Sequence, residues 1–398
     1  MMKKFKDLIT ANGVFSDGDW VESKDQDPNG DVRLIQLADI GVGTFINKSN
    51  RFMTSEKAEE LKCTYLEKGD ILIARMPEPI GRACIFPELK NKCVTVVDIC
   101  IVRPASDEID SRWLMHLINS ERFNNQILKF VTGTTRQRIS RGNLAKLDVE
   151  VPPLDEQKRI AAILDKADSV RRKRQQAINL ADDFLRSVFL DMFGDPVTNP
   201  KGLPQVKLTE LSDVISGYAF KSAEYIENSE DSVRLCRGAN TLTGYFEWKD
   251  TVYWNKEKLA GIQNYKIKAG DVILAMDRPW ISSGLKVCVF PENERDTYLV
   301  QRVARIRPKN PKYTDFLYAS ILSKAFEKHC CPTETTVPHI SPVELKNFNV
   351  LVPDEKLVDK YHDAVVKVLK SKLAMQKSAV EASNAFNSLS QKAFAGEL

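Results

Sequence analysis

The 398-residue sequence lacks the usual marks of a membrane-bound, secreted or metal-binding protein. It contains no run of about 18 apolar residues, so no membrane-spanning helix is expected. Its first ten residues, MMKKFKDLIT, lead into no apolar segment of a secretory signal. Eight cysteines and four histidines follow no zinc-ligand spacing. We therefore expect a cytoplasmic chain that does not contact a membrane and holds no metal.

Sequence motifs of catalysis are also missing. The sequence has no G-x-x-x-x-G-K-[ST] phosphate loop, no G-x-G-x-x-G after a strand and no [ND]-P-P-[FYW] methyltransferase segment. The acidic pair at 354–355 opens a predicted helix, where the helix macrodipole favours negative charge, and so does not indicate a nuclease site. A net charge of +4 is too small to indicate nucleic-acid binding by itself. We predict no catalytic residue in this chain.

The chain repeats itself at an offset of 201 residues. The phrase TGTTRQRIS (132–140) shares five of nine residues with TETTVPHIS (333–341), and GDILIA (69–74) matches GDVILA (270–275). A C-[IV]-F-P phrase at Cys84 matches one at Cys288 with an offset of 204. The second copy therefore carries three extra residues after its Gly-Asp strand. Regular spacing over most of the chain indicates a tandem duplication.

Each copy has the same order of elements. Short β-rich runs broken by Gly, Pro, Asn and Asp come first, with one helical patch (111–130 or 313–329), and a long helix follows (155–193 or 354–394). The predicted fold class is α+β, with two tandem-repeated β-rich domains separated and joined by two long antiparallel helices resembling a coiled coil. We assign the domains to residues 1–153 and 195–353 and the spacer helices to residues 154–194 and 354–398.

Both long helices carry an apolar stripe in heptad steps, which is typical of a coiled coil. A helix of 39 residues spans about 58 Å, more than one small domain covers. We expect the helices to pack as an antiparallel pair; the alternative is that each packs only on its own domain or on a partner. The basic run 171–174 is interpreted as solvated or partner-facing. The predicted seam consists of Ile160, Leu164, Ala167, Ile178, Leu185, Val188, Tyr361, Val365, Val368, Ala379, Phe386 and Leu389.

The two copies keep their apolar framework but differ at polar positions. Because Arg reads guanine and Asn or Gln reads adenine, such changes are what two domains reading different base sequences would show. Drift of exposed residues would give a similar contrast. The changes are Gln36 to Arg237, Asp39 to Asn240, Asp98 to Arg302, and Arg75-Met-Pro to Asp277-Arg278-Pro279.

The chain resembles the specificity subunits of type I restriction–modification enzymes over nearly all its length. The resemblance is carried by TGTTRQRIS, by VPPLDEQKRIAAIL (151–164), by FLRSVFLDMFGDP (184–196) and by AFNSLSQKAFAGEL (385–398). The second copy departs from the pattern, because Glu334 replaces the glycine of the phrase and VPDEKLVD is a weaker version of the helix entry.

The resemblance implies a non-catalytic subunit that selects a DNA site. Each β-rich domain would read one half of a split, asymmetric double-stranded target, and the helix pair would fix the unread gap. It also implies two methyltransferase subunits carrying S-adenosylmethionine, docked on the helices, and two restriction subunits using ATP and magnesium. The alternatives are a stand-alone DNA-binding regulator or scaffold without methylase partners, and an enzyme in its own right.

We expect DNA contact from polar residues in both copies, since hydroxyl, amide and guanidinium groups bind phosphates and base edges. The candidates in the first copy are Gln36, Arg75, Thr134, Thr135, Arg136, Arg138 and Arg141. Those in the second copy are Arg237, Asn240, Arg278, Trp280, Gln301, Arg302, Thr335, Thr336 and His339.

Overall fold

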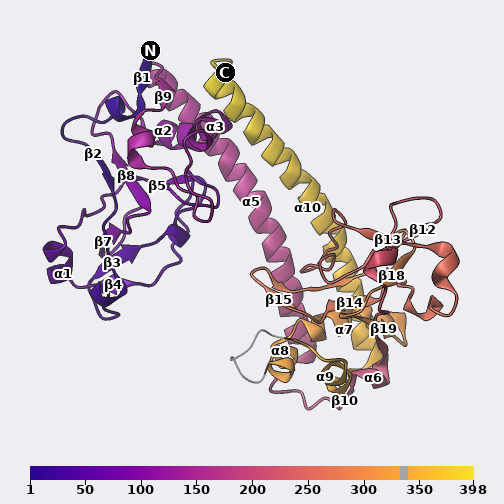
Figure 1. The fold of residues 1–398 in the computed structure, drawn as a ribbon. Helices are drawn as coiled ribbons and strands as arrows, with labels where there is room; N and C mark the ends of the chain where they lie inside the picture. The colour runs from indigo at the N-terminus through magenta and orange to yellow at the C-terminus, as the bar shows by residue number, and fades with distance from the viewer. Residues whose placement is uncertain (332–338) are drawn as a thin grey trace. The chain divides into compact units, whose positions relative to one another are not determined.

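The computed structural model describes residues 1–331 and 339–398. The chain divides into two compact units, one formed by Met1–Gln175 with Gln376–Leu398 and the other by Gln176–Met375. Each unit contains one β-rich domain and a segment of each of two long helices, α5 (Leu154–Phe193) and α10 (Glu355–Ala395), as Figure 1 shows. No helix in the described part of the chain is long and apolar enough to cross a membrane.

The first domain has a four-stranded sheet, a three-stranded sheet and a two-stranded sheet, ordered β2-β8-β5-β6, β4-β3-β7 and β1-β9. All neighbouring strands are antiparallel except β3 and β7, which run parallel. The strands are β1 (Met2–Lys4), β2 (Val14–Asp17), β3 (Val32–Ile35), β4 (Phe52–Met53), β5 (Ile71–Ala74), β6 (Ala83–Ile85), β7 (Lys92–Thr95), β8 (Ile99–Arg103) and β9 (Asp148–Glu150). Four short α-helices lie between these strands or beside them: α1 (Ser55–Glu60), α2 (Ser111–Ile118), α3 (Glu121–Leu128) and α4 (Arg141–Ala145).

The second domain repeats this topology. Its sheets are ordered β11-β19-β14-β17, β13-β12-β18 and β10-β20, and β12 and β18 form the parallel pair. The strands are β10 (Gln205–Lys207), β11 (Ser212–Ser216), β12 (Ser232–Cys236), β13 (Val252–Asn255), β14 (Val272–Ala275), β17 (Val287–Val289), β18 (Thr297–Leu299), β19 (Val303–Pro308) and β20 (Asn349–Leu351). The helices are α6 (Leu208–Leu211), α7 (Thr314–Ile321), α8 (Lys324–Cys330) and α9 (Pro342–Asn347). The predicted α+β duplication is confirmed.

The three extra residues of the second copy belong to a small hairpin. Strands β15 (Trp280–Ile281) and β16 (Gly284–Leu285) pair antiparallel directly after β14, where the offset changes from 201 to 204. Each predicted helical patch is two helices rather than one. In the first domain the Ser120 hydroxyl accepts the Phe123 N–H and so begins α3, and in the second Ser323 caps α8 in the same way.

The two long helices are antiparallel, as predicted, because each unit pairs opposite ends of them. In the first unit the Arg171 guanidinium lies 4.6 Å from the centre of the Phe386 ring. In the second unit Lys372 Nζ lies 2.6 Å from Asp182 Oδ1. The predicted seam residues are buried or half-buried throughout. These residues also enter the domain cores: Ile160 and Leu164 pack in the first core and Tyr361 and Val365 in the second.

Candidate nucleic-acid interface

A closed polar loop, 132–138, lies at the surface of the first domain. Thr132 and Arg138 exchange backbone N–H···O bonds of 3.0 and 2.9 Å, while Thr134, Thr135 and Arg136 are exposed. Gly133 has a φ of +93°, and a Cβ on it would lie 2.4 Å from the Arg136 carbonyl oxygen. The loop therefore requires glycine here, and it presents two hydroxyls and a guanidinium to solvent.

Backbone hydrogen bonds fasten this loop to the ends of β5 and β8. The Ile139 N–H donates to the Arg75 carbonyl at 3.1 Å, and the Arg75 N–H donates to the Asp98 carbonyl at 2.9 Å. The Arg138 Nη2 then lies 3.4 Å from Asp98 Oδ1. Arg141, the first residue of α4, donates to the Phe15 carbonyl at 2.8 Å. We call this arrangement the first corner, made by Asp17, Arg75, Asp98, Arg138 and Arg141.

Arg75 supports the first corner from inside rather than facing solvent. Only 3% of it is exposed. Its Nη1 lies 3.1 Å from Asp17 Oδ1, and its Nη2 donates to the Val97 carbonyl. Burial lowers the pKa of the Arg75 guanidinium and the Asp17 charge opposes that shift. Arg75 therefore supports the corner from within its own domain, and the DNA contact expected of it stays a prediction.

The change from Asp39 to Asn240 concerns two buried side chains that each hold a loop. The Asp39 carboxylate accepts the N–H groups of Gln36, Lys48 and Ser49 at 2.7–2.8 Å. Asn240 is 1% exposed; its Oδ1 accepts the Arg237 N–H at 3.1 Å and its Nδ2 donates to the Glu247 carbonyl at 3.0 Å. Asn240 thus supports its own loop, and the base contact expected of it stays a prediction.

The partners of these loop supports are only half-buried. Gln36 is half-buried beside the Asp39 loop. Arg237 is also half-buried, and its Nη2 donates to the Asp250 carbonyl, which holds the side chain along its own domain. Both side chains keep part of their surface in solvent, but the structure does not bring either into contact with a corner.

The second domain has an equivalent corner centred on Asp277. The Met276 N–H donates to the Arg302 carbonyl at 3.0 Å, and the Ile340 N–H donates to the Met276 carbonyl at 2.9 Å. These two bonds match those around Arg75, so Met276 corresponds to Arg75 and Arg302 to Asp98. This corrects the comparison of Arg75 with Asp277, which was one residue out of register.

Charged side chains gather at this second corner. Asp277 accepts a hydrogen bond from Arg302 Nη1 at 3.1 Å and lies 3.7 Å from His339 Nδ1. Arg278, Gln301 and Arg302 are exposed, whereas Trp280 in β15 is half-buried against the core. The predicted contacts Thr335 and Thr336 lie outside the described residues.

The acidic members of both corners were not among the predicted contacts. Asp98 and Asp277 differ between the copies, which was the available signal, but a carboxylate is not expected to approach a phosphate backbone. Nothing in the sequence marks Asp17, whose role depends on β2 lying beside β8. The corners are therefore mixed-charge sites.

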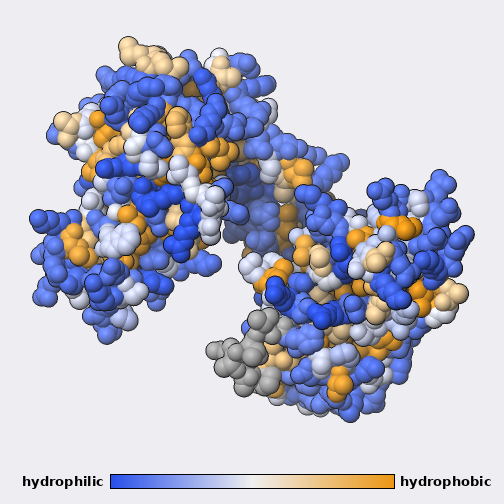
Figure 2. Space-filling model, in the orientation of Figure 1, coloured by the Kyte–Doolittle hydropathy of each residue, from blue (hydrophilic) through white to orange (hydrophobic). Residues whose placement is uncertain are grey.

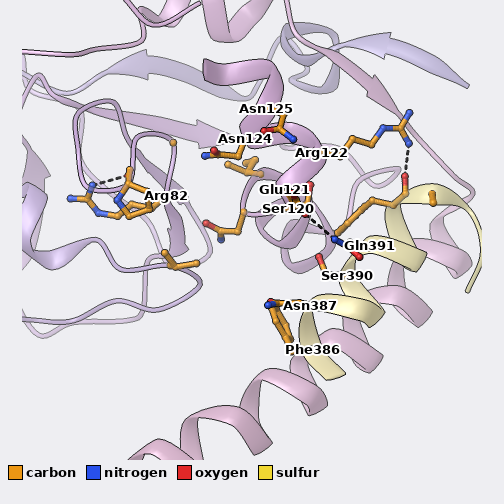
Figure 3. Close-up of a pocket in the computed structure, with 17 residues that line it drawn as sticks. Arg82, Ser120, Glu121, Arg122, Asn124, Asn125, Phe386, Asn387, Ser390 and Gln391 are labelled. Atoms are coloured by element: carbon orange, nitrogen blue, oxygen red, sulfur yellow. Dashed lines mark hydrogen bonds between the residues drawn. The ribbon is translucent and has the colours of Figure 1, made fainter. Parts of the chain in front are cut away.

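A cavity of about 780 Å³ lies in the first unit, between α3 and the end of α10. Figure 3 shows Asn124, Arg122 and Glu121 on one side and Ser390 and Gln391 on the other. Gln391 donates to Glu121 at 2.8 Å, and Arg122 donates to the Phe394 carbonyl. These bonds tie α10 to the domain, and none of the predicted contact residues within 1–331 and 339–398 lines the cavity. We assign it to helix attachment.

The described residues form no cluster of three or more His, Cys, Asp or Glu side chains that could hold a metal ion. The visible face of each domain is largely hydrophilic, with scattered apolar patches (Figure 2). The groups available to a ligand at the two corners are hydrogen-bonding and charged side chains.

Comparisons with known proteins agree with this arrangement. Residues 1–180 match the family described as type I restriction modification DNA specificity domain. The chain is 26% identical over 255 residues to the type I restriction enzyme MjaVIII specificity subunit of Methanocaldococcus jannaschii, covering 60% of this chain and 59% of that protein. It is 31% identical over 153 residues to the EcoAI specificity subunit of Escherichia coli, covering 38% of this chain and 26% of that one.

The match to a solved structure extends over the whole fold. The type I restriction-modification system S subunit from M. genitalium superposes with a TM-score of 0.53 at 14% identity, covering 99% of this chain and 96% of that one. The matched segments span 59% and 26% of the two relatives named above. Residues 1–180 thus match the type I restriction modification DNA specificity domain, and the whole chain shares the fold of a type I S subunit.

Proposed function

We propose that this chain selects the DNA site of a type I restriction–modification complex, with each β-rich domain reading one half of a bipartite, asymmetric target. The observation that carries the proposal is a repeated scaffold with unlike side chains. The same two backbone bonds build both corners, yet Asp98 and Arg138 of the first are replaced by Arg302 and His339 in the second. Two equal scaffolds with different polar groups suit two different base sequences.

Within the first domain, the loop 132–138 offers the most accessible contacts. The hydroxyls of Thr134 and Thr135 and the Arg136 guanidinium are exposed, and groups of this kind bind phosphates and fix the position of a protein on a duplex. The Arg138 side chain is 39% exposed, and its Nη2 lies 3.4 Å from Asp98 Oδ1. We assign Arg138 to a base contact, and Arg136 to a phosphate contact.

The long helices would set the gap between the two half-sites. Helix α5 has 40 residues and α10 has 41, so each is about 60 Å long at the rise of an α-helix. Both ends of each helix are anchored by large apolar side chains in a domain core, such as Phe189 and Phe193 at the end of α5. A helix fixed at both ends suits a spacer of constant length.

The helices would also dock methyltransferase subunits. Val366, Leu369 and Leu373 of α10 are 50%, 45% and 68% exposed, and they recur at a spacing that places them on one side of the helix. Exposed aliphatic residues gathered in this way indicate a protein contact. We propose two methyltransferase subunits, which would bring S-adenosylmethionine, and two restriction subunits, which would bring ATP and magnesium. The chain itself would be non-catalytic.

Mapping of methylated bases in the host genome, with and without this gene, tests the proposal. We expect a two-part asymmetric motif that loses its methylation when the gene is deleted. Co-purification tests the subunit composition, with two methyltransferase subunits expected for each chain. A stand-alone regulator or scaffold would leave the methylation map unchanged and would purify without a methyltransferase.

A further inference from the structure

In the corner of each domain a carboxylate lies beside an arginine whose side chain reaches solvent. The two arginines are not equivalent in sequence, because the other copy has a different residue at each position. In the first corner the acid, Asp98, stands beside the start of β8, and the arginine, Arg138, lies on the returning side of the loop. In the second corner the arginine, Arg302, takes the place of Asp98, and its acid, Asp277, follows β14. Both corners therefore hold an acid–arginine pair, but at different positions: Asp277 corresponds to Met76, and His339 stands where the first domain has Arg138.

Such a pairing suits contact with a base more than contact with a phosphate. A carboxylate on one edge of a guanidinium fixes its plane and reduces the conformational freedom lost on binding. Guanine O6 and N7 need two donors in a fixed plane, whereas a phosphate accepts donors from many directions. An acidic group beside a phosphate contact would also weaken it by repulsion.

The geometry of Arg138 further limits how it can bind. Its Nε is buried, so the exposed portion of the side chain is the Nη end. Nη2 lies 3.4 Å from Asp98, and the two Nη groups carry four N–H donors between them, so donors remain for a second partner. Arg302 has a φ of +64°, and its side chain is 69% exposed, with Nη1 held by Asp277.

We propose that Asp98 and Asp277 are positioning residues that hold Arg138 and Arg302 for a bidentate contact with guanine, one guanine in each half-site. The inference rests on the proposed function and adds a base to each half of the target. It also makes the two acids determinants of specificity that touch no DNA themselves.

The test uses the full chain purified with its methyltransferase partner and a duplex carrying the motif found by methylation mapping. Each guanine is replaced in turn by 7-deazaguanine, which lacks the N7 acceptor but pairs normally. We expect one such position in each half-site to weaken binding by about 5- to 150-fold, the range of one bidentate contact. The effect should disappear in Arg138→Ala for the first half-site and in Arg302→Ala for the second.

The acids are tested with Asp98→Asn and Asp277→Asn. Each variant should bind random duplex as tightly as the parent or more tightly, because a negative charge is removed, while discrimination at its one guanine falls about fivefold or more. The matched controls are Asp148→Asn and Asp296→Asn, which remove exposed acids paired with Lys4 and Lys266. A structural role alone would lower the melting temperature and weaken binding to all duplexes.

The outcomes separate this inference from the proposed function. A complex that binds target and random duplexes with equal affinity contradicts both the proposed function and the positioning role of the two acids. Specific binding that is insensitive to 7-deazaguanine in both half-sites, or unchanged discrimination in both acid variants, overturns only the positioning role of the two acids.

Discussion

The rings of Phe193 and Tyr361 meet at 5.4 Å with their planes 79° apart, where the end of α5 packs against the beginning of α10. The Phe189 ring approaches the same tyrosine at 5.8 Å, and Phe316 of α7 lies 4.9 Å from Phe193. Edge-to-face contacts of this kind add to the burial of the rings. This aromatic cluster joins both long helices to the second domain within one core.

Removing one ring from this cluster should destabilise the second unit. Tyr361→Ala is expected to cost about 3–5 kcal/mol of unfolding free energy, since it deletes a large buried ring and leaves a cavity. Tyr361→Phe keeps the ring and should change stability by less than about 1 kcal/mol. Urea unfolding followed by tryptophan fluorescence measures both. Equal urea midpoints for the alanine and phenylalanine variants would show that the cluster contributes little.

Gly133→Ala should damage the loop 132–138. The left-handed backbone and the 2.4 Å approach to the Arg136 carbonyl leave no room for a methyl group. We expect a cost of about 1–3 kcal/mol at this site and reduced methylation of the target. Gly142→Ala is the control, because a Cβ there would meet only the Ser140 hydroxyl at 3.9 Å. Normal target methylation in Gly133→Ala would show that the loop shape is not needed for recognition.

Arg136→Ala should weaken binding to target and random duplexes by a similar factor. If Arg136 neutralises one phosphate, the slope of log K against log salt should become shallower by about one. Lys158→Ala removes an equal exposed charge from α5 and should leave the slope unchanged. A titration of binding between low and physiological salt decides the matter, and an unaltered slope in Arg136→Ala would remove this residue from the interface.

Leu373→Glu should release the methyltransferase partner. A charge placed in the exposed stripe of Val366, Leu369 and Leu373 would be costly to bury in an interface. The same change at Lys377, an exposed position farther along α10, is the control for altered charge on this helix. Size-exclusion chromatography of the co-expressed proteins gives the number of methyltransferase subunits bound per chain. An unchanged number for Leu373→Glu would place the docking surface elsewhere.

The duplication could be predicted because residues 69–74 and 270–275 match in sequence. Two copies of one sequence pattern are expected to form sheets with the same strand order, as they do. Antiparallel helices followed from the stripe at equal positions of both copies. The break at Ser120 could also have been seen, since Ser120-Glu121 is an ordinary beginning of a helix. Periodicity alone does not reveal such a break within an apolar stretch.

The roles of single polar residues were harder to predict. Arg75 and Arg138 look alike in sequence, but β2 brings Asp17 against the first and so buries it. Asp39 and Asn240 suggested different base readers, yet both are sealed inside their own loops. Whether a polar side chain is buried depends on strands that are distant in sequence. A polar difference between the two copies can therefore occur at a buried residue that supports a loop as well as at an exposed residue that could contact DNA. Only geometry separates the two.

The first hydrophobic core contains Ala393 and Phe394 beside Ile160 and Leu164. During synthesis the ribosome releases the early segments of this core long before the last ones. The apolar residues of the first core therefore stay partly uncovered in the nascent chain while the second domain is being synthesised. The first core is therefore complete only after Ala393 and Phe394, which follow the whole second domain in the chain, have been added.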